Sequence, residues 1–214
     1  MRKLFLPIAL FFATISTILS ATCFAPTQDH EPKPVLSKDS LSAEQIAVYR
    51  AALADYMQEE DKALNLADRT EPFGFNDFQD DKSCLKSANI QIDINKANFI
   101  QRLDPAVALS PKMILVDPDQ QNETVKKNDA GNLIQRSIED QHPVTDRELG
   151  ESVKQAFATG LFTFSEIAFN KLHSRAALKY SFVCGGLCGH GNTLLLKKVD
   201  GKWKVSKKCG GWIA

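Results

Sequence analysis

The spacing of apolar residues changes along the chain, and this change predicts where helices and strands lie. From Ile46 to Met57 the apolar residues recur at intervals of three and four, which is typical of a helix with one buried face. Ser42 and Gln45 precede this stretch as a Ser-x-x-Gln capping box, the pattern that begins many helices. The expected buried stripe of this helix comprises Ile46, Tyr49, Leu53, Tyr56 and Met57.

A second helix is predicted nearer the middle of the chain. Thr145 and Glu148 form another capping box, and Gly160 occupies the position where glycine commonly ends a helix at about Thr159. Between the two helices the pattern is short and mixed. It predicts strands in Lys62–Thr70 and Lys112–Asp117, a short helix in Asn95–Leu103, a loop in Glu71–Cys84, and a polar segment in Lys126–Asp140 with a turn at Asn128–Asn132.

From Leu161 onward the apolar period falls to two, which indicates strands. Asp200-Gly201 lies between the last two runs and is a strong two-residue hairpin signal. Sequential strands joined by short turns form an antiparallel meander, and the earlier helices need an apolar face to cover. We therefore predict an α+β fold whose four strand runs are Leu161–Phe169, Ala176–Cys184, Asn192–Val199 and Lys202–Ile213.

The first 25 residues have the layout of a secretory signal peptide. Arg2 and Lys3 precede the uncharged apolar run Leu4–Leu19, and small residues surround a cleavage site expected after Ala25. The run is shorter than the roughly 20 residues that span a bilayer, so we expect a mature protein without a transmembrane segment. We therefore predict export to the periplasm or the outside of the cell. Lipidation at Cys23 is an alternative, although Ser20 and Thr22 fit a lipoprotein signal poorly.

Composition narrows the function classes. The full chain has 26 basic and 26 acidic residues, so removal of Arg2 and Lys3 with the leader leaves 24 basic against 26 acidic. This near-balance gives no support for a nucleic-acid-binding domain, which needs a clustered basic excess. Residues 26–40 are rich in proline and charge, which predicts a flexible lead-in to a single domain over residues 41–214.

Four cysteines remain after the leader: Cys84, Cys184, Cys188 and Cys209. An even number in an exported protein favours disulfides, and four cysteines allow three pairings. We favour Cys184–Cys188 with Cys84–Cys209. By the loop-closure relation, the second of these bridges would stabilise the fold by about 4 kcal/mol.

The segment Cys184–Asn192, CGGLCGHGN, is the densest group of reactive residue types in the chain. Its place between two predicted strands makes it a hairpin tip. A redox dithiol is disfavoured, because the two cysteines are separated by three residues and glycines oppose the following helix that lowers a thiol pKa. A metal site would use Cys184, Cys188 and His190 with Cys209 or His173, but an oxidising compartment consumes thiols.

A cysteine nucleophile with His190 as its base lacks an identifiable third group, since His142 and His173 are distant in sequence. The favoured interpretation is a turn whose shape the Cys184–Cys188 bridge holds. A thiol- or metal-dependent enzyme centred on Cys184, Cys188 and His190 is kept as the alternative. The aromatic trio Phe73, Phe75 and Phe78 could line a ligand pocket, but aromatic residues in a long loop more often anchor it to the core.

The last third of the chain resembles a pattern in secreted bacterial proteins to which no activity is attached. The matching segments are Phe164–Asn170, Ala176–Val205 and Gly211–Ile213, which read as FSxxxFN, CGxxCGxG, GKW and a terminal WI. The resemblance implies secretion and carries no catalytic residue.

No phosphate-binding Gly-rich loop, His-Glu-x-x-His helix or Gly-x-Ser-x-Gly elbow occurs in the sequence, and no cofactor is expected. We therefore expect a non-catalytic domain that binds an envelope protein or a small ligand. Its candidate contact residues are Phe73, Phe75, Phe78 and His190.

Overall fold

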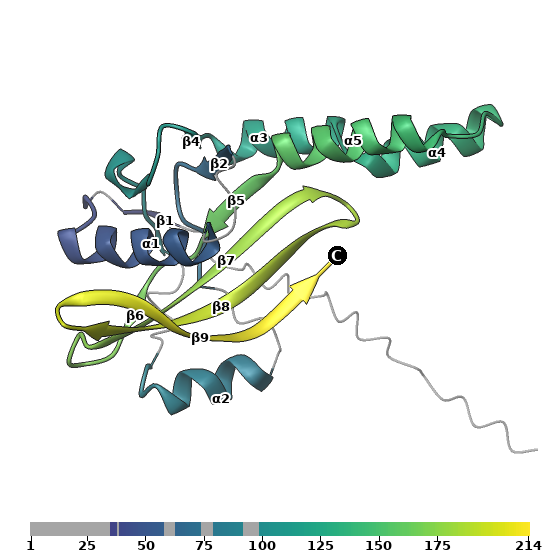
Figure 1. Cartoon of the computed structure of the whole chain (residues 1–214). Coiled ribbons are helices and arrows are strands. Elements are labelled where there is room, and N and C mark those ends of the chain that lie inside the picture. Colours follow the sequence, from purple (N-terminus) through teal and green to yellow (C-terminus); the bar gives the residue numbers. More distant parts are fainter. Residues whose placement is uncertain (1–34, 38, 58–62, 74–78, 92–98) are drawn as a thin grey trace, which may run out of the picture. The chain divides into compact units, whose positions relative to one another are not determined.

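A mixed β-sheet flanked by helices organises the fold (Figure 1). The computed structural model describes residues 35–37, 39–57, 63–73, 79–91 and 99–214, all within one unit. The elements of the first half are β1 (Val35–Leu36), α1 (Ala43–Tyr56), β2 (Leu64–Ala67), α2 (Gln79–Ser87), β3 (Phe99–Ile100), the 3-10 helix η1 (Pro105–Val107) and β4 (Met113–Val116). Those of the second half are α3 (Pro118–Lys127), α4 (Ala130–Asp140), α5 (Asp146–Thr159), β5 (Leu161–Phe164), β6 (Ala168–Phe169), β7 (Arg175–Gly185), β8 (Cys188–Val199) and β9 (Lys202–Ile213).

The strand order of the sheet is β4-β2-β5-β7-β8-β9, and β6 pairs with β7 beside β5. β5 through β9 pair antiparallel, which confirms the predicted α+β class and its C-terminal meander. β2 pairs in parallel with both β4 and β5, so the meander continues into a parallel part that the sequence pattern did not indicate.

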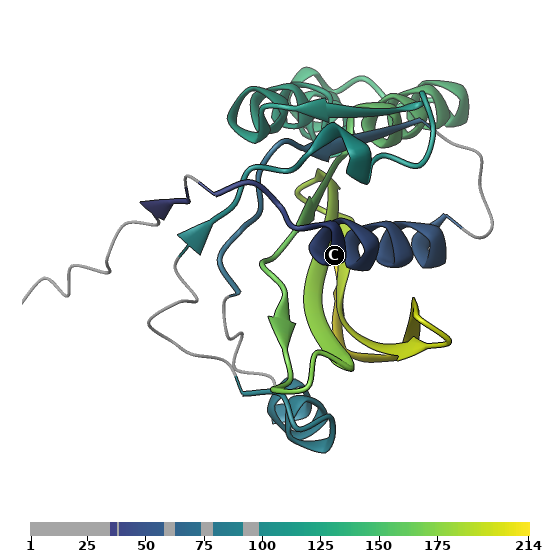
Figure 2. The ribbon, with the colours of Figure 1, turned by 90° about the vertical axis from the view of Figure 1, so that its left-hand side faces the viewer.

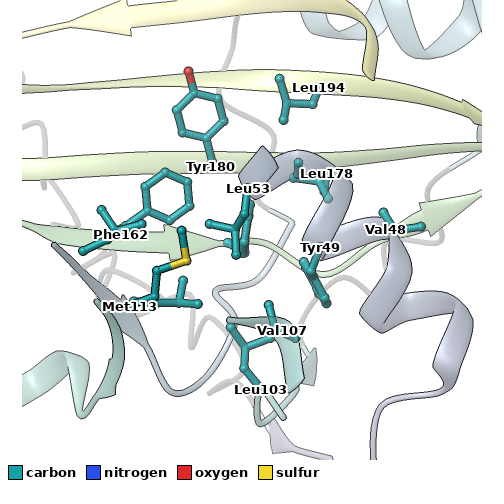
Figure 3. Close-up of a cluster of buried hydrophobic side chains, with 14 of the residues drawn as sticks. Val48, Tyr49, Leu53, Leu103, Val107, Met113, Phe162, Leu178, Tyr180 and Leu194 are labelled. Atoms are coloured by element: carbon teal, nitrogen blue, oxygen red, sulfur yellow. The ribbon is translucent and has the colours of Figure 1, made fainter. Parts of the chain in front are cut away.

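Helix α1 packs on one face of this sheet and forms the main core with it (Figures 2 and 3). The predicted capping box is present: the Gln45 amide N–H donates to the Ser42 hydroxyl at 3.2 Å, and the Gln45 side chain accepts from the Ser42 amide at 2.8 Å. The side chains of α1 that are buried in this core are Val48, Tyr49, Ala52 and Leu53. Tyr49 and Leu53 belong to the predicted stripe, whereas Ile46, Tyr56 and Met57 are partly buried at its border.

The predicted helix after Thr145 is α5, and its capping box is also present. Its apolar residues Val153, Ala156 and Phe157, spaced as one helical face, divide between two environments. Ala156 is buried, but Val153 and Phe157 remain 38% and 54% exposed. A helical face predicted to cover the sheet therefore leaves part of its apolar surface accessible.

The sequence pattern indicated only a polar segment with a turn in Lys126–Asp140, whereas most of this segment belongs to helices α3 and α4. The turn signal at Asn128–Asn132 marks the junction between them. Asp117 caps α3, with Pro118 in its first turn, and Asp129 caps α4 by accepting from the Gly131 amide at 2.9 Å. Asp and Asn side chains bond nearby backbone amides both in turns and at the start of helices. A sequence with such residues at helix caps therefore resembles a loop.

Three further predictions differ from the structure in the N-terminal half of the domain. Phe99–Ile100 lies in a strand, not in the predicted helix Asn95–Leu103; residues 95–98 lie outside the described ranges. Its partner is Val35–Leu36, so the expected flexible lead-in 26–40 contains a strand, although residues 26–34 are not described. The predicted loop Glu71–Cys84 also ends early, because α2 begins at Gln79.

The predicted strand Leu161–Phe169 is interrupted at Ser165. β5 pairs with residues 180–183 of β7 and β6 with residues 176–177, so the two short strands follow one partner. At the break, the buried Tyr49 hydroxyl donates to the Ser165 carbonyl at 3.1 Å. Side-chain bonding from α1 thus compensates a backbone group that leaves the regular ladder.

Glu166 follows this break, and partial burial raises the pKa of its carboxyl from 4.5 to about 7 by desolvation. The folded state therefore holds the proton that the unfolded chain releases near pH 4.5. The resulting stabilisation is present below that pH and is lost as the pH rises through about 7. After allowance for solvent screening, we expect the wild type to lose about 1–2 kcal/mol over this range.

Glu166→Gln should remove the contribution of Glu166 to that loss, which urea unfolding at pH 4.5 and pH 8 would measure. Glu123→Gln is the matched control, because Glu123 is exposed and Lys126 lowers the pKa of its carboxyl by a side-chain hydrogen bond. Equal pH dependence in the wild type and Glu166→Gln would contradict the assignment.

Both predicted disulfides are present, with the favoured pairing. Cys84 in α2 joins Cys209 in β9 with their Cα atoms 6.3 Å apart, and Cys184 joins Cys188 across 5.1 Å. Measured against the length and hydropathy that a bilayer-spanning helix needs, every helix in the described ranges falls short.

Candidate functional site

The β7–β8 hairpin places the CGGLCGHGN segment as predicted, at a hairpin tip. Cys184 lies near the end of β7 and Cys188 begins β8, so Gly186 and Leu187 form the connection between the strands. Cys184 is buried, whereas Leu187 is 83% exposed. The disulfide therefore closes the base of a tip that presents one large apolar side chain to solvent.

Asp129 holds this tip against helix α4. One carboxylate oxygen caps α4 and the other accepts from the Gly186 amide at 2.7 Å. Gly185 is required here, because a Cβ at that position would lie 2.5 Å from the Asp129 carboxylate. The two hydrogen bonds of Asp129 thus hold the hairpin tip against the start of α4 (Figure 1).

An apolar groove of about 510 Å³ lies beside the β7–β8 hairpin tip. Three parts of the fold line it: helices α4 and α5, the β7–β8 tip, and the C-terminal end of β9. Exposed large apolar side chains gather there, and the lining ones with the largest exposures are Ile213 at 90%, Leu187 at 83%, Phe157 at 54% and Ile134 at 47%. Contiguous apolar surface of this kind marks interaction sites, whereas apolar residues exposed singly are common on any protein surface.

Helix α4 is amphipathic, yet none of its residues is buried in the described structure. Ile134 and Ile138 lie one turn apart and are 47% and 68% exposed. Leu149 and Val153 of α5 also line the groove with partial exposure. An apolar helical face normally packs on a core, so this one leaves surface that a partner can cover.

His190 forms part of the groove and lies among aromatic rings. Its ring stacks 5.8 Å from that of Tyr56 and lies 5.8 Å from that of Phe182 and 6.1 Å from that of Tyr180. Desolvation lowers the pKa of His190, and the nearby Lys208 charge lowers it further. His190 is thus a neutral, half-buried part of an aromatic wall at neutral pH.

Phe73, the member of the aromatic trio that the structure describes, is buried and offers no contact surface. This side chain is only 2% exposed and belongs to a core cluster with Cys84 and Leu85. The burial of Phe73 agrees with the interpretation favoured from the sequence, in which the aromatic residues anchor their loop to the core. Phe75 and Phe78 lie outside the described residues.

The alternative of a thiol or metal centre needs free thiolates at the tip. Cys184 and Cys188 are bonded to each other, and Cys209 is bonded to Cys84. Within the described ranges, no three His, Cys, Asp or Glu side chains are grouped in a way that would hold a metal ion. The arrangement at the tip favours shape and apolar contact over sulfur chemistry.

Comparison with protein-family models, curated proteins and solved structures found no match. The resemblance of the C-terminal third to secreted bacterial proteins therefore stays a prediction.

Sequence reasoning identified His190 and the cysteines but missed most of the groove. The missed residues are Asp129, Ile134, Leu149, Phe157 and Ile213. Spacing alone could have indicated Ile134 and Ile138 as one helical face, because they are four residues apart. Nothing in the sequence places that face beside the hairpin tip.

Proposed function

We propose that the protein is exported and binds an extended apolar segment of another protein at the groove beside Leu187. The signal-peptide layout of residues 1–25 and the two disulfides support an oxidising compartment outside the cytoplasm. The gathering of exposed apolar side chains from three parts of the fold at one groove carries the binding proposal.

An open strand edge beside the groove favours an extended partner. β9 is the last strand in the sheet order. Its first part carries charges that discourage strand addition, at Lys202, Lys204, Lys207 and Lys208, but its last part, Gly210–Ile213, carries none. The edge is thus protected along most of β9 and unprotected where it meets the groove.

Backbone direction at this edge suits pairing with a new strand. The Ala214 amide donates to the Gly189 carbonyl of β8 at 2.9 Å. Because successive amides in a strand point to opposite sides, the Ile213 amide faces away from β8. A partner strand would bond to this edge, and its alternate apolar side chains would enter the groove.

A fluorescent hexapeptide of alternating valine and threonine is a suitable probe, with binding followed by anisotropy. Leu187→Asp should weaken binding by about tenfold or more, because burial of one leucine contributes about 1.5–3 kcal/mol. Ile213→Pro should also weaken it, since proline removes the outward amide and is tolerated on an edge strand.

Leu172→Asp is the matched control, because Leu172 is as exposed as Leu187, at 83%, but does not line the groove. Equal affinity of all variants for the peptide, or no binding by the wild type, would refute the proposal. Concentration-dependent dimerisation abolished by Leu187→Asp would identify a second copy of the chain as the occupant instead.

A further inference from the structure

A second cleft, of about 360 Å³, lies on the sheet face opposite α1 and is independent of the groove proposal. The residues of β7 that point away from α1 define its position. Ala177 packs in the cluster beside α2 and Val183 packs against the cluster that includes Val125 of α3, while Lys179 and Ser181 between them line the cleft. The two covered ends leave a polar floor in the middle of the sheet.

Thr193 is the most informative residue of this floor. Its side chain lines the cleft, and the residue is only 2% exposed. Across the described part of the chain, its hydroxyl makes no hydrogen bond. Buried hydroxyls are nearly always bonded, so one that faces a cleft without a partner points to a ligand group that completes it.

Other hydroxyls and one carboxyl extend the polar floor. Thr163 and Ser181 share a hydrogen bond of 2.8 Å, and each hydroxyl keeps capacity for one more. Glu71 lines the same cleft, and desolvation raises the pKa of its carboxyl. By contrast, the Ser165 hydroxyl is already used, as donor to the Glu166 carbonyl and acceptor from the Lys179 amide.

Trp212 supplies an aromatic wall at the β9 side of the cleft. Its indole packs closely against β8, because a Cβ on Gly191 would lie only 2.5 Å from the indole Nε1. Gly189 likewise leaves room for the far edge of the ring. The indole is therefore held in one orientation by backbone contact before any ligand arrives.

Together these groups define the chemistry of the ligand. Glu71 and Lys179 bring opposite charges to the same cleft, so neither an anion nor a cation is favoured overall. Hydroxyls that both donate and accept suit a ligand rich in hydroxyls, and an aromatic face suits a ring with apolar C–H groups. A cleft of this volume accommodates one or two small rings.

We propose that this cleft binds a saccharide unit, with Thr193, Ser181 and Glu71 bonding its hydroxyls and Trp212 packing on its ring. The chain has two tryptophans, and the other, Trp203, is 7% exposed. In a Trp203→Phe background, fluorescence therefore reports on Trp212 alone. The probes are glucose, N-acetylglucosamine, cellobiose and chitobiose, each titrated to about 10 mM, which would saturate a site with a Kd of about 1 mM.

We expect at least one of the four saccharides to change the Trp212 emission saturably. Thr193→Val in the same background should weaken that binding about tenfold, which is the effect of one lost hydrogen bond. It should leave the unfolding midpoint unchanged or raise it, because the variant removes a hydroxyl that has no hydrogen-bond partner among the described residues.

The matched control is Thr70→Val, which removes another buried threonine hydroxyl. Thr70 accepts from the Gln101 amide at 2.8 Å, so its loss should lower stability and leave saccharide binding unchanged. No response to any of the four sugars, a response to free alanine in their place, or equal affinity in Thr193→Val would overturn the proposal. Leu187→Asp should not alter the titration, so failure here and failure at the groove are distinguishable.

Discussion

The double substitution Cys84→Ala and Cys209→Ala is expected to lower the free energy of unfolding by about 4–5 kcal/mol. These cysteines are 125 residues apart, and a bridge that closes a long loop removes much conformational entropy from the unfolded chain. Denaturant unfolding of the oxidised proteins measures the difference. Thermal unfolding should show the same order of stability.

The double substitution Cys184→Ala and Cys188→Ala is the matched control, because its partners are only 4 residues apart. The same relation gives about 2 kcal/mol for so short a loop. This second variant should instead weaken peptide binding at the groove, since the bridge holds the tip that presents Leu187. Equal stability losses in the two double variants would contradict this division between a bridge for stability and a bridge for shape.

Phe162→Ala should lower the free energy of unfolding by about 3–5 kcal/mol, which is typical of a large aromatic residue removed from a core. Phe162 is fully buried (Figure 3). Its ring lies 4.6 Å from that of Tyr56, 5.0 Å from that of Phe164 and 5.4 Å from that of Tyr180. The substitution therefore leaves a cavity between α1 and the sheet.

Phe157→Ala provides the comparison at a surface position of the same residue type. Phe157 is 54% exposed and lines the groove, so its loss should change stability by less than about 1 kcal/mol. It should still weaken peptide binding. A large stability loss in Phe157→Ala would mean that this apolar surface belongs to the core and is not available to a partner.

Local sequence signals succeeded where the deciding interactions lie within a few residues. The capping boxes at Ser42 and Thr145 involve side chains and amides three positions apart, and both formed as predicted. The Asp200-Gly201 turn joins β8 and β9, because its backbone twist matches the strands that it connects. These features need no information about distant parts of the chain.

Local signals failed where distant contacts decide the structure. Phe99 and Ile100 form a strand because Val35 and Leu36 lie beside them, although the surrounding residues have helical spacing. The segment of α3 and α4 is polar enough to resemble a loop, and two aspartate caps turn it into helices. Leu161–Phe169 has one strand pattern, yet it is divided where Tyr49 bonds the Ser165 carbonyl.

The sequence by itself determined the α+β class, the principal capped helices and the C-terminal hairpins, and its even cysteine count indicated disulfides. These features depend on the spacing of apolar residues, on hydrogen bonds between residues close in sequence and on the number of cysteines. All three can be read from the linear sequence. The tertiary structure alone decided that Leu187, Phe157 and Ile213 share one groove, and that Thr193 faces a cleft with no hydrogen-bond partner in the described part of the chain. The physical reason is that a binding surface is made of side chains far apart in sequence, and only packing brings them together.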